Sequence, residues 1–419
     1  MIHKKKSLGK HRVVFLHLHE YLLPIPRVHY MAEALVKEGY EVNVICVAEK
    51  FKDIPPGIIN GVSVWNAGYG LKINEDVKLN RRIDLLIRIK KNMERLCVQL
   101  NPDAIHVFSP ELLPLGVKLK GGLNTLLLYD CYEYWFGSKL SAKKPLKALR
   151  TFFMELYGLH YIDAITIVYD KNPVLNFLKQ NIKKCIVYNT RQERDLEDYK
   201  KSIDIKKSIG DKKFIVGYIG LIFKMRGYIE AIKSLRYLDN DIILMLIGGF
   251  RDEKFKDKLL KLIKKEGLEN RVYITGMLPY NEVLNYGSAT DVCLLLFEDR
   301  LINKYSTPNK LFEYMSLGKP IISTNIENLK YFIDKYNCGI TVPPKNPLAI
   351  AEAILKLKKN RELLEKLGNN GKNAFVKHFS VEKQTKNLIQ LYQSLLPINL
   401  SFRLYILDPQ HIHNLPLFP

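Results

Sequence analysis

Short apolar runs rich in β-branched and aromatic residues alternate with longer segments of helical periodicity in the first half of the chain. The run at 12–19 is followed by a helical segment at 27–39, and helical segments also separate most of the later runs. This alternation is typical of βαβ units that build a parallel sheet. Strands are therefore predicted at 12–19, 40–47, 103–108, 123–129, 163–168 and 184–189.

A polar, highly charged stretch at 190–213 interrupts this pattern, which then begins again. Two amphipathic helices are expected within 347–378 and 381–396, where they would close the second unit. The strands predicted for this half lie at 214–220, 242–248, 271–276, 291–297, 319–324 and 339–343.

The two halves predict an α/β protein with two Rossmann-like, doubly wound domains that face each other across a cleft. We place the N-terminal domain at 1–190 and the C-terminal domain at 191–397, whose last helix can return to the N-terminal domain. Residues 398–419 are rich in Ile and Leu and contain no Lys, so we expect a tail outside the fold. Ligands of such folds bind in the cleft, at the carboxyl ends of the strands.

Composition indicates a folded protein without a membrane-spanning segment. Of the 419 residues, 47% are apolar and 26% are charged, and no apolar run reaches the about 18 residues that span a bilayer. His17, His19 and Glu20 interrupt the apolar stretch near the N-terminus, so no signal peptide is expected. The six cysteines are far apart and form no CxxC pair, which favours free buried thiols in a cytoplasmic protein over disulfides or a zinc site.

The net charge of +22 is spread over both halves of the chain and implies an anionic partner. Nucleic acid, a membrane surface and phosphorylated substrates all fit this charge. A basic nucleic-acid-binding protein is therefore an alternative function. However, the sequence contains no helix-turn-helix, zinc-finger or RNP-type motif, so we expect no nucleic acid partner.

The segment TPNKLFEYMSLGKP at 307–320 predicts a helix of about three turns with two unlike faces. Thr307 and Pro308 favour its start, whereas Gly318 and Pro320 favour its end. A helical projection at 100° per residue separates the remaining side chains into two sets. The apolar face carries Leu311, Phe312 and Met315, and the opposite face carries Asn309, Lys310 and Glu313.

The polar face of this helix has the chemistry of a nucleotide site. Unpaired N–H groups at a helix N-terminus suit a phosphate, and Lys310 adds a full positive charge there. Glu313 can accept hydrogen bonds from two adjacent sugar hydroxyls. The alternative is a solvated face with a salt bridge between Lys310 and Glu313.

Two glycine-containing turns follow predicted strands and can approach a phosphate closely. In the first, Gly220 ends a strand and the following loop carries Lys224 and Arg226. In the second, Gly248 and Gly249 end the next strand. Each turn is a common feature of βα units when taken alone.

The ordered set of these motifs resembles the family 4, or group 1, glycosyltransferases. The resemblance includes VYITGMLP at 272–279 and FEYMSLGKPI at 312–321. Segments 26–45, 102–115 and 129–135 resemble the first helix and middle strands of the N-terminal domain of that family. Together the matches extend over roughly residues 12–395.

The resemblance implies the GT-B fold and a hexosyltransferase-type enzyme that needs no metal and no other cofactor. Such an enzyme transfers a sugar from a nucleotide-sugar donor to an acceptor, with retention of configuration, in surface glycan, polysaccharide or glycolipid assembly. By position, Arg226 and Lys310 would be catalytic cations on the departing diphosphate. Donor-binding positions would be Glu313 on the ribose, with Asn309, Pro308, Gly220, Lys224, Gly248 and Gly249.

Three positions depart from the family pattern. Tyr305 stands where the family often has a second glutamate, Leu221 replaces an arginine, and Tyr132 replaces a histidine. Tyr132, Glu133 and Tyr305 are therefore candidates for contacts with the acceptor or the donor sugar. A catalytically impaired nucleotide-sugar-binding protein is the corresponding alternative function.

Asp130 and Glu133 follow a predicted strand that ends at the cleft. We expect Asp130 to act in catalysis by orienting the acceptor hydroxyl or accepting its proton. Capping of the following loop is the structural alternative. His17 and His106 are further imidazoles, for which burial beside a strand is the expected role.

The segment from Tyr134 to Met154 contains no acidic residue. Basic side chains at 139–150 lie between aromatic ones, an arrangement that suits an anionic membrane interface but also a solvated helix over core aromatics. The family resemblance favours the membrane, because members that build surface glycans often use lipid-linked acceptors. We expect a cytoplasmic protein, peripheral on the inner face of the plasma membrane, with a lipid-linked acceptor.

Overall fold

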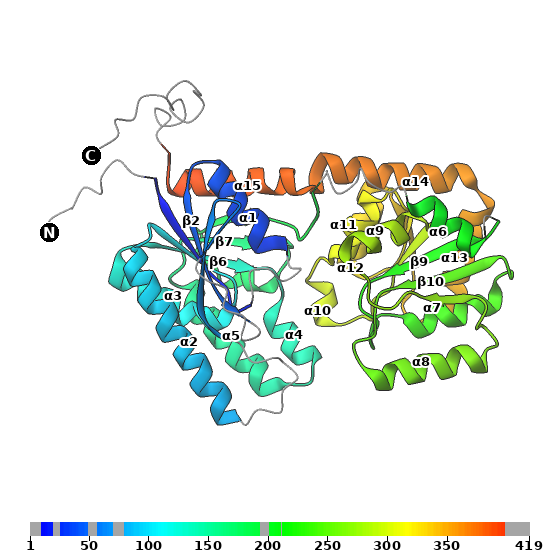
Figure 1. Cartoon of the computed structure of the whole chain (residues 1–419), viewed down its shortest axis with the longest axis horizontal. Coiled ribbons are helices and arrows are strands. Elements are labelled where there is room, and N and C mark those ends of the chain that lie inside the picture. The colour runs from blue at the N-terminus through cyan, green and yellow to red at the C-terminus, as the bar shows by residue number, and fades with distance from the viewer. Residues whose placement is uncertain are drawn as a thin grey trace, which may run out of the picture.

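The computed structural model describes residues 10–19, 26–48, 57–69, 79–192, 201–210 and 212–398. Within them the chain forms two α/β domains that lie side by side (Figure 1). The N-terminal sheet has the strand order β3-β4-β2-β1-β5-β6-β7-β8, in which only β3 and β4 pair antiparallel. Its strands are β1 Arg12–Leu16, β2 Glu41–Ala48, β3 Gly57–Ile59, β4 Val62–Tyr69, β5 Ala104–Val107, β6 Leu126–Cys131, β7 Ala164–Ile167 and β8 Lys183–Ile186.

Helices cover both faces of this sheet. The α-helices are α1 Pro26–Lys37, α2 Leu79–Leu100, α3 Leu113–Leu123, α4 Trp135–Ser141 and α5 Pro145–Leu159, and the 3-10 helices are η1 Pro110–Leu112 and η2 Pro173–Phe177.

The C-terminal sheet is entirely parallel, with the strand order β11-β10-β9-β12-β13-β14. Its strands are β9 Phe214–Ile219, β10 Ile242–Ile247, β11 Val272–Ile274, β12 Val292–Leu295, β13 Ile321–Thr324 and β14 Gly339–Val342. The helices are α6 Lys201–Ile209, α7 Tyr228–Ser234, η4 Leu235–Tyr237, α8 Glu253–Lys265, α9 Tyr280–Ser288, α10 Leu301–Lys304, α11 Asn309–Ser316, α12 Glu327–Tyr336, α13 Pro347–Lys359, α14 Arg361–Ala374, the π-helix η5 Phe375–Phe379 and α15 Val381–Leu395.

The predicted α/β class with two doubly wound sheets is confirmed. All six residues of β10 are buried, because a parallel strand covered by helices on both faces is apolar on both sides. The hairpin of β3 and β4 was not predicted, although Asn60 and Gly61 between the strands are a strong hairpin signal. Both residues have positive φ, 51° and 80°, as a type I′ turn requires.

The C-terminal helices differ from the prediction in number. The segment 347–378 holds two α-helices rather than one, because Asn360 ends α13 and caps α14, where its side chain accepts from the N–H of Leu363 (2.9 Å). The last helix, α15, packs on the N-terminal sheet, and its Leu388, Leu391 and Tyr392 belong to that domain's core. In Figure 1, α14 and α15 run along one edge of the molecule and connect the two domains.

The chain crosses between the domains twice, and the crossings touch. The first follows β8 and the second precedes α15. The N–H of Val381 in the second donates to the carbonyl of Arg191 in the first (2.8 Å). Residues 193–200 of the predicted linker and 399–419 of the predicted tail lie outside the described residues.

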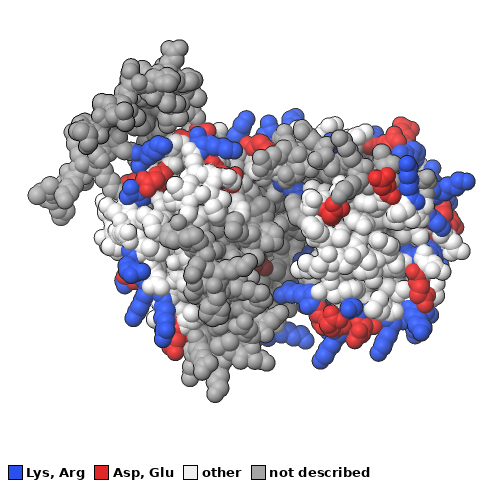
Figure 2. All heavy atoms as spheres, in the orientation of Figure 1, with Lys and Arg blue, Asp and Glu red and all other residues white. Residues whose placement is uncertain are grey.

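The described surface is basic over both domains, as the charge of the sequence predicts. Figure 2 shows Lys and Arg side chains on both domains rather than in a single stripe. The six cysteines are buried and free, as expected. Among the described helices, none is both long and apolar enough to cross a membrane.

Candidate active site

Helix α11 is anchored by one face and presents the other, as its sequence predicts. Leu311, Phe312 and Met315 are completely buried, whereas Asn309 is exposed. Tyr314 is also buried, and its hydroxyl accepts from the N–H of Ile219 (3.0 Å) and donates to the carbonyl of Leu294 (3.0 Å). Tyr314 therefore fixes α11 to β9 and to the end of β12. Pro308 precedes the helix in an extended conformation (ψ 139°).

The ammonium group of Lys310 lies at the carboxyl end of β9 without a hydrogen-bond partner among the described residues. Lys310 as a whole is half-buried, but its Nζ is buried and lies 4.8 Å from the ring centre of Tyr218. Burial, followed by the charge of Arg226, lowers the pKa of Lys310 well below its usual value. Buried polar groups nearly always have partners, so this position suits an anionic ligand.

Gly220 makes room for that ammonium group. Its φ is +112°, and a Cβ built on it would lie 2.8 Å from Lys310 Nζ. Only glycine combines this backbone conformation with such a close approach. Gly220 therefore provides space for Lys310 at the end of β9, and its contact with a donor phosphate stays a prediction.

Arg226 contributes the second positive charge at this strand end. Its guanidinium lies over the rings of Phe223 (4.8 Å) and Phe297 (4.4 Å), and burial lowers its pKa. The hydroxyl of Tyr218 donates to the carbonyl groups of Arg226 and of Leu296, the latter at 2.8 Å. The loop that carries Arg226 is thus held in place by a buried tyrosine.

The remaining glycine-loop residues have less specific positions. Lys224 is exposed in the same loop. Gly248 has a φ of +143°, and a Cβ on it would lie 2.5 Å from the carbonyl oxygen of Gly220. Its N–H already donates to Thr275 Oγ1 (3.0 Å), and Gly249 packs against Met277. These glycines therefore let β9 and β10 end close together.

Glu313 pairs with Arg191 and not with Lys310. Arg191 Nη2 lies 3.0 Å from Glu313 Oε1, and the side chains are 3% and 15% exposed. No described ion pair joins Lys310 and Glu313, so the predicted salt-bridge alternative is wrong for the described structure. Arg191 was missed because it lies in the predicted linker, outside any motif. The only feature of the sequence that marks Arg191 is its position two residues after the strand predicted at 184–189.

Asp130 does not face the cleft, and this expectation is wrong. It is completely buried, and its two carboxylate oxygens accept from the guanidinium of Arg27, each at 2.6 Å. Thr166 Oγ1 donates to the same carboxylate (2.6 Å). A carboxylate with these partners holds β6, β7 and α1 together and does not reach an acceptor.

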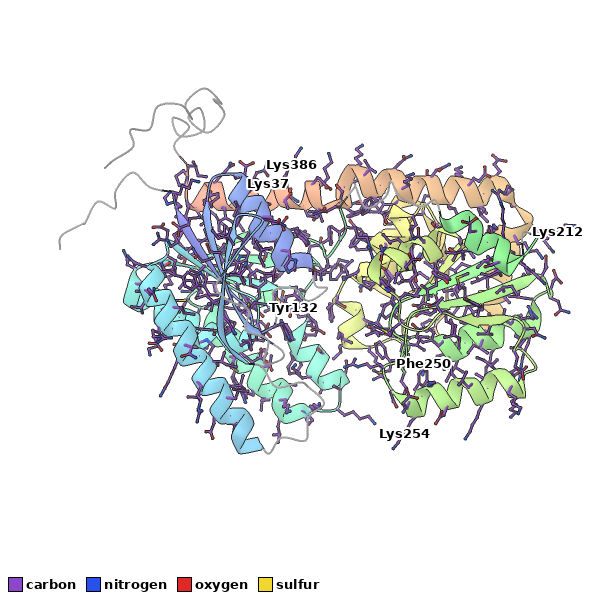
Figure 3. The ribbon with its side chains drawn as sticks, viewed as in Figure 1. Lys37, Tyr132, Lys212, Phe250, Lys254 and Lys386 are labelled. Carbon is purple, nitrogen blue, oxygen red and sulfur yellow. The ribbon has the colours of Figure 1, made fainter. Side chains whose placement is uncertain are left out.

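The tyrosines that depart from the family pattern lie at the domain boundary. Tyr132 packs edge-on against Trp135 (5.2 Å), and Figure 3 places its label on the side of the N-terminal domain that faces the other domain. Tyr305 contacts Tyr134 across the boundary, with ring centres 5.3 Å apart. Burial raises the pKa of the neighbouring Glu133.

The two histidines are structural, as expected. Both are buried, and burial lowers the pKa of each to about 4. His106 Nδ1 lies 2.9 Å from the hydroxyl of Tyr392 on α15. Among the described residues, no three His, Cys, Asp or Glu side chains come together as metal ligands.

Comparison with known proteins identifies the family of this fold. Residues 199–374, which include β9, Arg226 and the whole of α11, match the family model for glycosyl transferases, group 1. The C-terminal domain is therefore a group 1 glycosyl transferase domain over the matched residues. The matched residues contain every predicted donor-site position.

Curated relatives match the chain over different lengths. An uncharacterized glycosyltransferase of Methanocaldococcus jannaschii is 23% identical over 55% of this chain, which spans 60% of that protein. A second one from the same organism is 28% identical over 85% of this chain and 95% of its own length. A capsular polysaccharide biosynthesis glycosyltransferase of Staphylococcus aureus is 22% identical over 78% of this chain and 87% of its own.

Solved structures share the two-domain fold. Sucrose-phosphate synthase from Thermosynechococcus elongatus superposes with a TM-score of 0.78 at 15% identity, covering 93% of this chain and all of that one. HepE of Anabaena, solved in complex with UDP, gives a TM-score of 0.72 at 14% identity, covering 91% of this chain and all of its own. The chain therefore has the predicted GT-B fold.

Proposed function

We propose that the protein is a retaining glycosyltransferase that uses a nucleotide-sugar donor. The observation that carries this proposal is the buried ammonium of Lys310, which has no described hydrogen-bond partner and lies beside Gly220 and the guanidinium of Arg226. A leaving nucleoside diphosphate gains negative charge in the transition state. Two cations fixed at one strand end stabilise that charge without reorganisation.

The polar face of α11 supplies the remaining donor contacts in this proposal. Glu313 accepts the two ribose hydroxyls, and the N–H groups at Asn309 and Lys310 meet the diphosphate at the helix N-terminus. The complex of Anabaena HepE with UDP supports a nucleotide in this fold. The capsular polysaccharide relative supports an acceptor in surface glycan assembly.

Two variants test the donor site. Glu313→Ala removes hydrogen bonds to a charged group, worth roughly 1.5–3 kcal/mol each, so donor affinity should fall about tenfold or more. Lys310→Ala should lower turnover beyond its effect on binding, because its charge matters most as the diphosphate leaves. Nucleotide diphosphate binding is measured by calorimetry and turnover with UDP-, GDP- and ADP-sugars.

The control is Lys330→Ala, which removes an exposed lysine paired with Asp334 on α12. The proposal is wrong if wild type binds no nucleoside diphosphate, or if both site variants keep wild-type affinity while folded. If the protein binds a donor but transfers no sugar from it, either to an acceptor or to water, the result would instead support the alternative of a catalytically impaired nucleotide-sugar-binding protein.

The membrane contact through residues 139–150 is part of the same proposal. Lys143, Lys144, Lys147 and Arg150 are exposed, and the same surface of α5 exposes Leu146 (83%), Leu149 (49%) and Phe153 (57%). The alternative, a solvated helix over core aromatics, requires its aromatic side chains to be buried. The exposure of Phe153 argues against it. Apolar residues among basic ones favour an anionic lipid surface.

Vesicle flotation tests this contact. Each basic residue near an anionic surface is worth about 1 kcal/mol, so replacing Lys143, Lys144 and Lys147 by Glu should release the protein from anionic vesicles. The matched control makes the same charge change at three exposed lysines of α8, Lys254, Lys258 and Lys261. Wild-type protein that does not float with anionic vesicles at low salt would refute the contact.

A further inference from the structure

An apolar pocket in the N-terminal domain lies between the proposed membrane surface and the proposed donor site. Helices α4, α5 and η2 line it, and its volume is about 30 Å³, or about 310 Å³ when the open solvent at its mouth is counted. Its walls include four aromatic rings and one carboxyl group. The lining residues that matter here are Tyr134, Phe136, Phe152, Glu155, Leu156 and Phe177.

The pocket wall is part of a continuous row of aromatic rings. The row begins at Phe153, which is 57% exposed on the outer side of α5 and lies 5.7 Å from Phe152. Phe152 is 5.8 Å from Phe136, which is 6.2 Å from Tyr134. Apolar surface therefore extends from the exposed face of α5 through the pocket.

The row ends at the C-terminal domain, close to the donor helix. Tyr134 contacts Tyr305, which follows α10 and lies four residues before the start of α11. Helices α4 and α10 also lie next to each other at the domain boundary, as Figure 1 shows. A molecule held in the pocket would thus have one end at the lipid surface and the other near the transferred sugar.

The pocket suits hydrocarbon better than a sugar or a phosphate. Glu155 is its only acidic or basic lining residue among those described, and it is buried with its Oε1 accepting from the hydroxyl of Tyr129 (2.7 Å). Burial raises the pKa of Glu155 to about 7, so its charge is suppressed. A sugar needs several hydrogen-bond partners when it leaves water, and aromatic walls do not supply them.

We propose that this pocket binds a hydrocarbon segment of a lipid-linked acceptor, whose polar head group extends toward Tyr305 and the donor site. This proposal rests on the proposed glycosyltransferase function, because that function provides the donor site toward which the head group extends. The occupant is an alkyl or isoprenyl chain that enters from the anionic membrane surface beside α5.

The test uses alkyl phosphates of six, eight and ten carbons, below the concentration at which they form micelles. Binding is measured by calorimetry on the full-length protein. Each methylene that enters the pocket should tighten binding about threefold to fourfold. Inorganic phosphate and UDP serve as the head-group and donor-site probes in the same samples.

Val174→Phe places a larger side chain in the pocket wall and should weaken decyl phosphate binding at least tenfold. Phe177→Ala is the second variant, because Phe177 is 46% exposed at the pocket and its loss is less disruptive to folding. It should weaken binding about threefold or more. The control is Leu348→Ala, at an exposed position of α13 (47%) and not among the pocket-lining residues, which should bind decyl phosphate as wild type does.

The outcomes separate this pocket from the donor site. UDP binding that is retained in Val174→Phe, with decyl phosphate binding lost, supports the pocket. Decyl phosphate binding without UDP binding supports the pocket and contradicts the proposed function. The hydrocarbon assignment is overturned if affinity does not change with the length of the alkyl chain. It is also overturned if benzyl alcohol, used as a ring-only probe without an alkyl chain, binds as tightly as decyl phosphate. Equal weakening in Leu348→Ala also overturns it, because it indicates nonspecific surface binding.

Discussion

Lys310 and Arg226 bring two positive charges together beside Gly220, and the described structure gives the Lys310 ammonium no hydrogen-bond partner. Burial and like charge both disfavour the protonated amine. The folded state tolerates this arrangement because the other face of α11, with Leu311 and Phe312, is completely buried. The stability of the helix and the chemistry of its exposed face thus come from different residues.

The lowered pKa of Lys310 predicts that nucleotide binding takes up a proton. A bound diphosphate adds negative charge and raises the pKa again. Between the two pKa values, the free amine is partly neutral and becomes protonated on binding. Affinity should therefore be highest below the free-state pKa and fall as the pH rises toward the bound-state pKa. Calorimetry in two buffers of different ionisation enthalpy, repeated over a pH series below the ordinary lysine pKa of 10.5, measures the uptake.

Lys310→Arg is the control for this prediction, because arginine keeps the charge and does not titrate in this range. The variant should show no uptake from this position. Equal proton uptake in wild type and in Lys310→Arg would assign the titration to another group.

The sequence was enough to find some residues of the candidate site but not others. Lys310 and Glu313 were found because helical periodicity is a local property. The burial of Asp130 could not be found this way, since it depends on Arg27, which is 103 positions away in the chain. Arg191 has the same difficulty, because its partner Glu313 lies 122 positions further along the chain.

At the scale of elements, α5 has three different sides. Ala148, Thr151 and Glu155 are buried toward the domain, Phe152 lines the apolar pocket, and Leu146 is exposed. The sequence predicted the basic, aromatic character of this helix. It did not separate the exposed Phe153 from the partly buried Phe152, because adjacent residues are distinguished only by how the helix packs.

The burial of Glu155 predicts a pH dependence of stability. Its pKa is raised to about 7 in the folded state, against an ordinary value of 4.5. Between these values the native state binds more protons than the unfolded state, so this contribution to stability is complete below pH 4.5 and is lost as the pH rises through about 7. Glu155→Gln removes the titration and keeps an acceptor for Tyr129.

The variant should therefore be more stable than wild type at pH 8, by up to about 3 kcal/mol, and nearly equal at pH 5. Chemical denaturation followed by circular dichroism at both pH values measures the difference. Glu352→Gln, at an exposed position of α13, is the control and should change little. A Glu155→Gln variant that is equally stabilised at both pH values would contradict the assigned titration.

At the scale of the molecule, the two domains are joined by the crossings at Arg191 and Val381 and by contacts across the cleft. Thr307 Oγ1 donates to the carbonyl of Val168 (2.9 Å), and Lys171 pairs with Glu327 (2.8 Å). Arg191 contributes to this connection through both its backbone and its side chain. Its carbonyl accepts from the second crossing, and its side chain reaches the residue proposed to hold the ribose.

This position predicts that Arg191 couples donor binding to the relative position of the domains. Arg191→Met keeps much of the side-chain volume but leaves the Glu313 carboxylate without its cation. An uncompensated, partly buried carboxylate turns toward water, and this change removes the acceptor geometry that a ribose needs. Donor affinity should fall about tenfold, and turnover should fall further because the side chain of residue 191 no longer ties the first crossing to α11. Calorimetry with nucleoside diphosphate and steady-state kinetics separate the two effects.

Arg191→Lys tests whether the charge alone is enough. A lysine restores the positive charge but not the geometry of a guanidinium, so it should recover part of the affinity and less of the turnover. The control for the loss of an ion pair in general is Arg12→Met, because the Arg12 guanidinium pairs with Glu41 in the N-terminal sheet (2.6 Å). Tighter donor binding in Arg191→Met would show that Arg191 competes with the ribose for Glu313. Arg191 would then hold the free enzyme in an unreactive state, rather than prepare it for the donor.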